Sequence, residues 1–195
     1  MSEKPVLPHQ NRRHILTVSV FLFAALAVCF ILWSALGKDP NKVPAAMLDK
    51  QAMPFSASWL QGQEHLAGAR PEGFRLDDFK GRPLVLNFWA SWCYSCRAEA
   101  RDFEAFWQRY KDRGIAVVGI AIQDTPEQAM QFARTYGKTY ILGLDGDDGK
   151  AAIDYGVTGV PETYFINKRG VLIHKEAGPV TTEMLARYAD ELLKE

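Results

Sequence analysis

The segment "NFWASWCYSC" (residues 87–96) contains two cysteines, Cys93 and Cys96, separated by two residues. Its first residues belong to a continuous apolar run, "PLVLNFWA" (83–90), whose length and composition predict a strand covered on both faces. After Cys93 the apolar side chains recur at helical spacing as far as Tyr110. The cysteine pair is therefore predicted to lie where a buried strand turns into a helix. Such a pair can be half of a zinc site, a structural disulfide or a reactive dithiol.

The reactive dithiol is the interpretation that the rest of the chain favours. A structural zinc site needs about four ligands, but the chain has three cysteines and its four histidines show no ligand spacing. A disulfide across two residues closes a tiny loop and constrains the unfolded chain little. At the start of a helix, free N–H groups and the helix dipole stabilise a thiolate and lower the pKa of Cys93. We therefore predict that Cys93 attacks a partner disulfide and that Cys96 resolves the mixed disulfide.

A second feature is an apolar segment near the N-terminus, residues 15–36, which contains neither a charge nor a proline. It is long enough for a membrane-spanning helix, which needs about 20 residues, whereas the apolar region of a cleaved signal peptide has only about 7–15. Cys29 lies in a sequence like a lipoprotein cleavage box, but valine replaces the small residue before it, so we assign Cys29 to the span. Arg12 and Arg13 precede the span. The positive-inside rule then predicts a cytoplasmic tail (1–14) and an exported C-terminal body.

The rest of the chain is divided into a linker and one globular domain. Residues 37–54 are rich in proline, lysine and aspartate and are interpreted as a tether, and residues 55–195 as the domain. Residues 58–72 lack a clear pattern and are interpreted as an extra loop near the dithiol. Strands are predicted at 83–90, 115–122 and about 140–144. One helix is predicted to follow Cys93 and end at about 110, and others at 125 to about 136, at about 148–155 and from 182 onward. Residues 163–168 and 171–176 are predicted to form a hairpin. Because parallel strands need helical crossovers, this order predicts an α/β fold with a mixed sheet and helices on both faces.

Composition and spacing argue against two other functions. The chain has 23 basic and 23 acidic residues and no long basic run, so no nucleic-acid surface is predicted. The acidic stretch "DGDDG" (145–149) does not fit an EF-hand calcium loop, because Lys150 and Gly156 stand where that loop needs glycine and glutamate. We interpret the stretch as a turn and predict no metal site.

Two motifs together carry a resemblance to a known family. The segment 87–96, followed by "GVTGVPET" (156–163), resembles the thioredoxin-like thiol–disulfide proteins, and more closely the membrane-anchored CcmG/DsbE group with its relatives TlpA and ResA. The resemblance extends from the anchor to the C-terminus. It implies a thioredoxin-like fold on the periplasmic side of the bacterial inner membrane and no diffusible cofactor. It also implies a dithiol that a membrane electron donor of the DsbD/CcdA type keeps reduced. Disulfides would then be reduced during cytochrome c maturation, so that haem can attach to the C-x-x-C-H thiols of apocytochrome c.

The resemblance also assigns roles to residues outside the cysteine pair. Pro161 matches a cis-proline that faces the dithiol and lets the backbone of Val160 pair with an extended substrate, although X–Pro bonds are cis in only about 5–6% of cases. Glu99 matches an acid that tunes the thiols; the alternative is an ordinary solvated glutamate. Glu162 would be a second acid or a partner contact. Trp92 would shape partner docking, unless it is a core tryptophan.

This sequence departs from the family pattern in two places. Asn87 stands where thioredoxin has a buried aspartate, which makes Glu99 or Glu162 the replacement proton acceptor. Tyr94 and Ser95 separate the cysteines, where family members often have a proline. This pair tunes the relative stability of thiolate and disulfide, so a broader role as a TlpA-like periplasmic reductant stays open.

The sequence is also compatible with three other functions. The same chemistry run in reverse would install disulfides, and only the reduction potential decides the direction. The two soft thiols could also hold Cu(I) in a protein that handles copper for oxidase assembly. A redox-inert docking domain is a further alternative, against which the intact cysteine pair argues.

Overall fold

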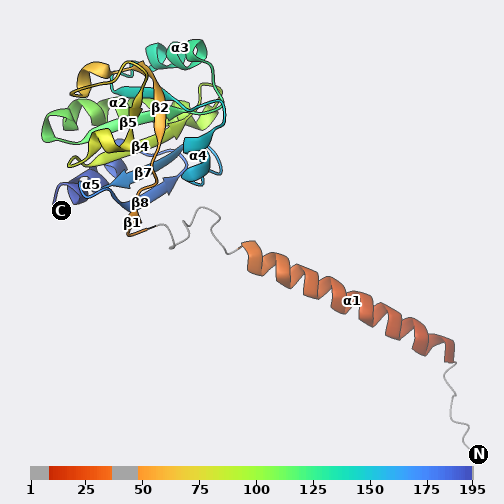
Figure 1. Ribbon diagram of the computed structural model, residues 1–195. Coiled ribbons are helices and arrows are strands. Elements are labelled where there is room, and N and C mark those ends of the chain that lie inside the picture. Colours follow the sequence, from red (N-terminus) through yellow and green to blue (C-terminus); the bar gives the residue numbers. More distant parts are fainter. Residues whose placement is uncertain (1–8, 37–47, 195) are drawn as a thin grey trace, which may run out of the picture. The chain divides into compact units, whose positions relative to one another are not determined.

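The computed structural model describes residues 9–36 and 48–194, in two compact units, Met1–Pro40 and Asn41–Glu195 (Figure 1). The first unit contains a long helix and the second is a globular domain. The predictions for residues 1–8 of the tail and 37–47 of the linker lie outside the described residues.

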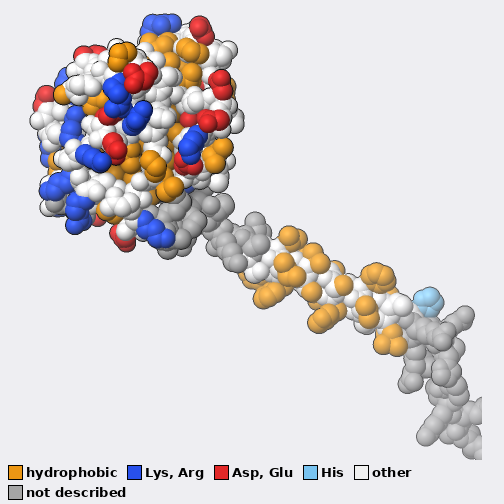
Figure 2. Space-filling view, in the orientation of Figure 1, with side chains coloured by type: hydrophobic (Ala, Val, Ile, Leu, Met, Phe, Trp, Pro, Cys, Tyr) orange, Lys and Arg blue, Asp and Glu red, His pale blue; other side chains and the backbone are white. Residues whose placement is uncertain are grey.

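Helix α1 (His9–Leu36) contains the whole predicted span of residues 15–36. Its section His14–Ser34 has a mean hydropathy of 2.9, and apolar side chains occupy the face of the helix seen in Figure 2. At 1.5 Å per residue this section is about 31 Å long, close to the roughly 30 Å thickness of a bilayer's hydrocarbon core. Cys29 is exposed within this uninterrupted helix. In the described part of the chain, α1 is the one helix long and apolar enough to cross a membrane.

The domain is built on a mixed sheet. Within residues 48–194, eight strands lie in the order β1-β8-β7-β4-β5-β6-β2-β3. The strands are β1 (Lys50–Gln51), β2 (Ser56–Gln61), β3 (Phe74–Arg75), β4 (Leu84–Trp89), β5 (Ala116–Ala121), β6 (Ile141–Leu144), β7 (Glu162–Ile166) and β8 (Val171–Ala177). β4, β5 and β6 are parallel, and every other pairing in the sheet is antiparallel. This is a thioredoxin-like fold, as predicted.

Helices cover both faces of the sheet (Figure 1). The helices are α2 (Tyr94–Tyr110), α3 (Pro126–Tyr136), α4 (Lys150–Asp154) and α5 (Thr182–Leu192). Apolar side chains of α2, α3 and α5 pack into one core, and those of α4 and the segments flanking β3 pack into another. From β4 onward, the elements follow the predicted order of strands and helices.

Strand β4 contributes to both cores. Val85 and Trp89 point into the core formed with α2, whereas Leu84, Leu86 and Phe88 point into the opposite one. Because side chains alternate along a strand and both faces are covered, all six residues of β4 are buried. This explains why its sequence is a continuous apolar run, and it places the following turn at the C-terminal edge of the parallel strands.

Local signals in the sequence set the ends of the shorter helices. Thr125 caps α3, Pro126 is its first residue, and Gly137 ends it in the left-handed conformation with φ 68°. Residues 145–149 form the predicted turn, in which Asp145 accepts hydrogen bonds from backbone N–H groups at the start of α4.

The N-terminal part of the domain differs from the sequence-based expectation. β1 pairs with β8 although it falls inside the predicted linker, so the sheet begins before residue 55. β2 occupies the start of the predicted loop 58–72 and pairs with β6, three strands away from β4. The interpretation of these residues as a loop near the dithiol is therefore wrong. Both strands lie near the edges of the sheet, where burial is partial and the apolar pattern is correspondingly weak.

Candidate active site

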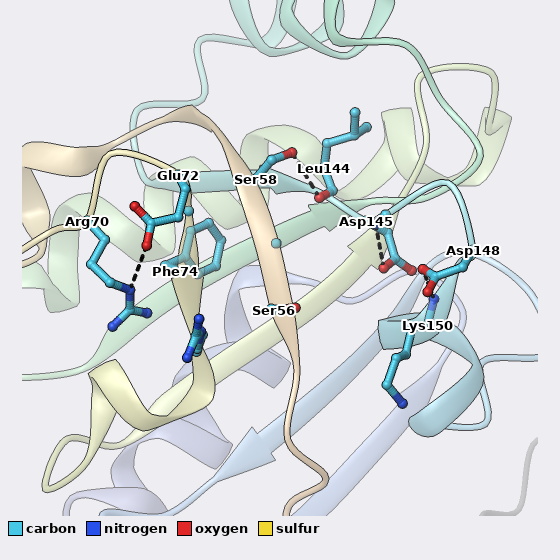
Figure 3. A pocket seen from close by; sticks show the side chains of 13 residues that line it. Ser56, Ser58, Arg70, Glu72, Phe74, Leu144, Asp145, Asp148 and Lys150 are labelled. Carbon is cyan, nitrogen blue, oxygen red and sulfur yellow. Dashed lines mark hydrogen bonds and ion pairs between the residues drawn. The ribbon is translucent and has the colours of Figure 1, made fainter.

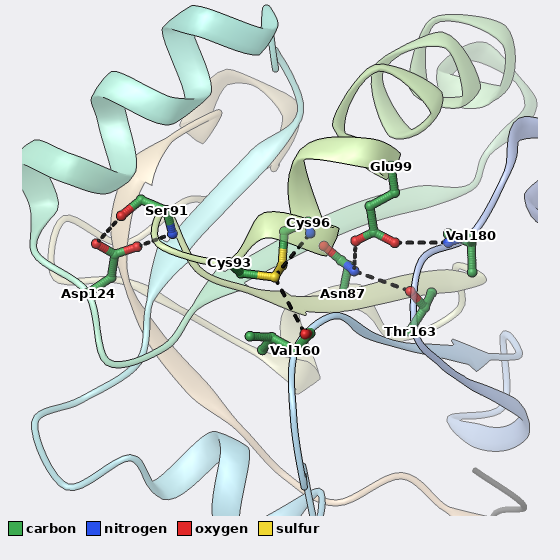
Figure 4. Close-up of a disulfide and its surroundings, with 9 residues drawn as sticks. All are labelled: Asn87, Ser91, Cys93, Cys96, Glu99, Asp124, Val160, Thr163 and Val180. Atoms are coloured by element: carbon green, nitrogen blue, oxygen red, sulfur yellow. Dashed lines mark hydrogen bonds between the residues drawn. A yellow bond between two sulfur atoms is a disulfide. The ribbon is translucent and has the colours of Figure 1, made fainter. Parts of the chain in front are cut away.

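The two cysteines form a disulfide where β4 leads into α2 (Figure 4). Cys93 is the N-cap of α2, and its Sγ accepts a hydrogen bond from the backbone N–H of Cys96 at 3.0 Å. Cys93 is 4% exposed and Cys96 1% exposed. The predicted position of the pair at a strand-to-helix turn is confirmed. Once the disulfide is reduced, the same N–H group and the helix dipole stabilise a thiolate on Cys93.

A backbone segment from the other side of the site faces Cys93. The Val160–Pro161 peptide bond is cis, as the family resemblance implies. The carbonyl oxygen of Val160 lies 3.4 Å from Sγ of Cys93. Beside them is a cavity of about 210 Å³ whose lining includes Ser95, Pro161 and Gly178. An extended peptide in this cavity would have both the sulfur and the backbone of Val160 within reach.

Asp124, which the sequence analysis did not single out, holds the turn that precedes the cysteines. Its carboxylate accepts hydrogen bonds from the backbone N–H of Ser91 at 2.6 Å and from the Ser91 hydroxyl at 2.8 Å (Figure 4). Asp124 lies just after β5, and residues that follow parallel strands gather at one edge of a sheet. The position of Asp124 just after a buried strand could therefore have indicated, from the sequence alone, that it lies near the cysteines.

Exposed aromatic side chains flank the buried disulfide. Trp92 is 54% exposed and its Nε1 donates a hydrogen bond to the carbonyl oxygen of Gln123 at 2.9 Å. Tyr94 is 82% exposed. The alternative interpretation of Trp92 as a core residue is therefore wrong. Aromatic residues are enriched at contact surfaces, so both side chains are candidates for contact with a partner.

Glu99 is a buried acid one helical turn beyond Cys96. Its carboxylate accepts hydrogen bonds from Nδ2 of Asn87 at 2.9 Å and from the backbone N–H of Val180 at 3.0 Å (Figure 4). Asn87 also donates to Oγ1 of Thr163 at 3.2 Å. Burial raises the pKa of Glu99 to about 7, against the opposing effect of both hydrogen bonds. The alternative of an ordinary solvated glutamate is wrong.

Lys138 is a second buried ionisable group near Glu99, and the sequence carried no signal for it. Its Nζ lies 3.8 Å from the centroid of the Trp89 ring. Burial lowers the pKa of Lys138 to about 7, while the negative charges of Glu99 and Glu104 act in the opposite direction. Because Glu99 and Lys138 interact, the protonation of each depends on the other.

Glu162 lies next to Pro161, but its carboxylate is bound away from the cysteines. Oε1 accepts hydrogen bonds from the backbone N–H and hydroxyl of Thr158, and Oε2 accepts from the hydroxyl of Tyr164 and pairs with Nζ of Lys175 at 2.7 Å. Burial raises the pKa of Glu162, but these partners outweigh that effect and hold it below its ordinary value. Glu162 thus fastens the segment that carries the cis-proline rather than serving as a second acid beside the sulfurs. Its predicted contact with a partner stays a prediction.

A separate cavity of about 310 Å³ lies between β2, β3 and the loop before α4 (Figure 3). Arg70 pairs with Glu72 at 3.7 Å, and its other nitrogens bind Asp78. No cysteine lines the cavity among the described residues. Within the same residues, no group of three His, Cys, Asp or Glu side chains is placed to hold a metal ion.

Disulfide exchange requires a sulfur that is stabilised as a thiolate, a second sulfur within bonding distance and access for a partner disulfide. Cys93, Cys96 and the cavity beside Val160 meet these requirements. The fold and the site therefore define a thioredoxin-like thiol–disulfide oxidoreductase.

Comparisons with known proteins give the family. The Redoxin family model matches residues 38–192. Thiol:disulfide interchange protein DsbE of Allochromatium vinosum is 31% identical over 175 residues, which cover 90% of this chain and 89% of the relative. The DsbE of Pseudomonas aeruginosa is 33% identical over 188 residues, which cover 94% of this chain and 97% of the relative. The chain belongs to the Redoxin family and, within it, to the thiol:disulfide interchange proteins of the DsbE type.

A solved structure supports the same assignment. The thiol:disulfide interchange protein, thioredoxin family protein, from Chlorobium tepidum TLS superposes with a TM-score of 0.62 and 26% sequence identity. The match covers 74% of this chain and 97% of that protein.

Proposed function

We propose that α1 anchors this chain in the bacterial inner membrane and that its domain reduces protein disulfides in the periplasm during cytochrome c maturation. The observation that carries the proposal is the position of Cys93, capped at the start of α2 and facing the backbone of Val160. The length and hydropathy of α1 support the anchor. The similarity to DsbE proteins supports the place in the maturation pathway.

The reductive reaction transfers two electrons from the dithiol to the substrate. The Cys93 thiolate attacks one sulfur of the substrate disulfide, whose S–S bond breaks, and the released substrate thiolate takes up a proton. Cys96 then loses its proton and attacks Sγ of Cys93, which releases the second substrate thiol and leaves the Cys93–Cys96 disulfide. A membrane electron donor of the DsbD/CcdA type would restore the dithiol by the same exchange run in reverse.

Glu99 is proposed to assist the second step through its charge. A group with a pKa of about 7 exchanges protons readily near neutral pH, and Glu99 lies one turn beyond Cys96 in the buried part of the site. It touches neither sulfur directly in this structure, so we treat it as a residue that tunes the proton release of Cys96.

The substrate is proposed to bind as an extended segment beside the cis-proline. The backbone of Val160 would pair with it, while Trp92 and Tyr94 offer exposed aromatic surface on the other side of Cys93. Apocytochrome c fits this description, because its C-x-x-C-H segment forms a disulfide that must be reduced before haem can attach.

Trapping of the mixed disulfide tests the proposal. The full chain carrying Cys29→Ser and Cys96→Ser is incubated in detergent with an oxidised peptide that contains C-x-x-C-H. We expect a covalent adduct through Cys93 that dithiothreitol releases, since the resolving sulfur is missing. The matched variant with Cys93→Ser should give no comparable adduct. Adducts through Cys96 alone would reverse the assigned roles, and none in either variant would refute this substrate class.

A further inference from the structure

A cavity of about 420 Å³ lies at the end of the sheet opposite to the disulfide. Leu84, the first residue of β4, and Ile166, the last of β7, line it and pair with each other. At the other end of these two antiparallel strands, Cys93 comes after the last residue of β4 and Pro161 comes just before the first residue of β7. At about 3.3 Å per residue, the length of β4, roughly 20 Å, separates the cavity from the dithiol. The cavity is therefore distinct from the candidate active site.

The lining of this cavity is strongly basic. Lys80, Arg82, Lys168 and Arg169 line it, and Asp77 is the one acid among the described lining residues. Lys80 pairs with Asp77 at 3.1 Å, and both side chains remain largely exposed. Arg82 and Lys168 form no ion pair within the described part of the chain. The cavity thus presents an excess of positive charge to solvent.

Backbone hydrogen bonds hold the three segments that form the cavity. The N–H of Ala52 donates to the carbonyl of Gly170 at 2.8 Å, and the N–H of Gly81 donates to the carbonyl of Lys168 at 3.2 Å. In the turn between β7 and β8, the buried Asn167 accepts hydrogen bonds through its side chain from the N–H groups of Arg169 and Val171. The basic side chains therefore extend from an ordered surface.

An acidic cavity lies at the dithiol end of the domain. A cavity of about 500 Å³ lies beyond the C-terminal ends of β5 and β6, and four aspartates line it: Asp124, Asp145, Asp147 and Asp148. No lysine or arginine is among its described lining residues. Although the whole chain has a formal net charge of zero, a basic cavity lies at one end of the strands and an acidic cavity at the other.

Chain connectivity limits how far the domain can lie from the membrane that α1 would span. Between Leu36 at the end of α1 and Lys50 at the start of β1 there are 13 residues, which reach at most about 45 Å in any conformation. A domain of this size is about 40 Å across. Directly after β1, Ala52 and Pro54 line the cavity.

We propose that the basic cavity docks on the anionic headgroups of phospholipids in the membrane that α1 spans, a proposal that rests on the proposed anchoring. The guanidinium group of Arg82 suits phosphate oxygens, and Lys80, Lys168 and Arg169 add positive charge. The anionic surface repels the acidic cavity at the other end of the strands. Docking therefore turns the dithiol away from the membrane, toward soluble substrates.

Lysine labelling in lipid nanodiscs tests this surface with the full chain. Rates of acetylation by an amine-reactive ester are measured residue by residue, by mass spectrometry, in discs of phosphatidylcholine alone and of phosphatidylcholine with phosphatidylglycerol. We expect Lys80 and Lys168 to react about five-fold more slowly in the anionic discs, the factor for one basic residue at an anionic surface. Lys150, at the acidic end and 70% exposed, serves as the internal control. Because the attraction is electrostatic, 0.5 M salt (about 4 Å screening length) should restore both rates.

Variants with matched charge changes complete the test. Arg82→Gln with Arg169→Gln should reduce the protection of Lys80 and Lys168, whereas Arg97→Gln with Arg101→Gln, exposed near the dithiol end of α2, should leave it unchanged. Equal labelling in both lipids, equal protection of Lys150, or equal loss in both variants would overturn the docking alone. If the chain failed to co-purify with the discs, the proposed anchor would fail and the docking with it.

Discussion

Glu99 is a carboxylic acid held inside the domain by donors from two other segments, the side chain of Asn87 and the backbone of Val180. Burial favours its neutral form and raises its pKa to about 7. Lys138, also buried, has a pKa lowered to about 7. The interior behind the dithiol thus contains two groups that change charge near neutral pH.

The raised pKa of Glu99 predicts a particular dependence of stability on pH. Between pH 4.5 and 7 the folded state binds more protons than the unfolded state, so the free energy of unfolding falls as pH rises through this window. The contribution of Glu99 is on the order of 3 kcal/mol. Lys138 acts with the opposite sign between pH 7 and 10.5, where stability rises with pH. The joint contribution of Glu99 and Lys138 to the free energy of unfolding should therefore be smallest near pH 7, which urea unfolding at a series of pH values would show.

The substitution Glu99→Gln should remove the fall in the free energy of unfolding that Glu99 causes between pH 4.5 and 7. Glutamine keeps an oxygen that can accept hydrogen bonds but does not titrate, so the variant should lose less stability than the wild type between pH 5 and pH 7. Glu127→Gln, on the exposed side of α3, is the matched control and should behave as the wild type does. An unchanged pH dependence in Glu99→Gln would show that the acid does not titrate in this range.

Among the residues of the site, the sequence could identify those whose role follows from their spacing along the chain. Cys93 and Cys96 stand out by their position at a helix start, and the resemblance located Pro161. Asp124 was identifiable in principle, but the partner of Glu162 was not. Glu162 binds Lys175 because of the register of β7 against β8, and that register shifts between Phe165 and Ile166, an irregularity that the sequence does not mark.

At the scale of elements, the short strand β1 extends the domain beyond the predicted boundary. Asp49 and Ala52 donate backbone hydrogen bonds to Leu172 and Gly170, on either side of the β1–β8 pairs. The side chains of Leu48 and Ala52 pack against the core. A fragment that begins at Phe55 loses all of these contacts.

We therefore expect a fragment of residues 55–195 to be less stable than one of residues 41–195. The difference should be about 1–3 kcal/mol, from the lost apolar burial and backbone pairing, or several degrees in the midpoint of thermal unfolding. The longer fragment with Leu48→Ala separates lost packing from lost pairing, and should fall between the two. Equal midpoints for both fragments would show that β1 adds nothing to the fold.

The elements that sequence predicted well share a physical cause. β4 and β5 are buried on both faces and read as continuous apolar runs, and α3 has a threonine cap and a glycine stop. β1, β2 and β3 are short or only partly buried, so neither alternation nor a long apolar run marks them. Their pairing depends on strands far away in the sequence.

At the scale of the whole molecule, the domain has an acidic cavity at the end of the sheet that carries the dithiol and a basic cavity at the opposite end. Thiol–disulfide exchange itself follows from the family and the site. The direction of electron flow is set by the reduction potential, which depends on how strongly the site stabilises thiolate over disulfide. Reduction of periplasmic disulfides is the central claim of the proposed function.

The midpoint potential of the Cys93–Cys96 pair tests that claim most directly. The fragment of residues 41–195 is equilibrated with dithiothreitol or glutathione buffers, and the reduced fraction is read by thiol trapping. A reductant supplied from the membrane should have a potential in or below the range from about −200 to −270 mV, where glutaredoxins and thioredoxin lie. A value near about −120 mV, that of a strong oxidant, would contradict the account and assign the protein to disulfide formation instead.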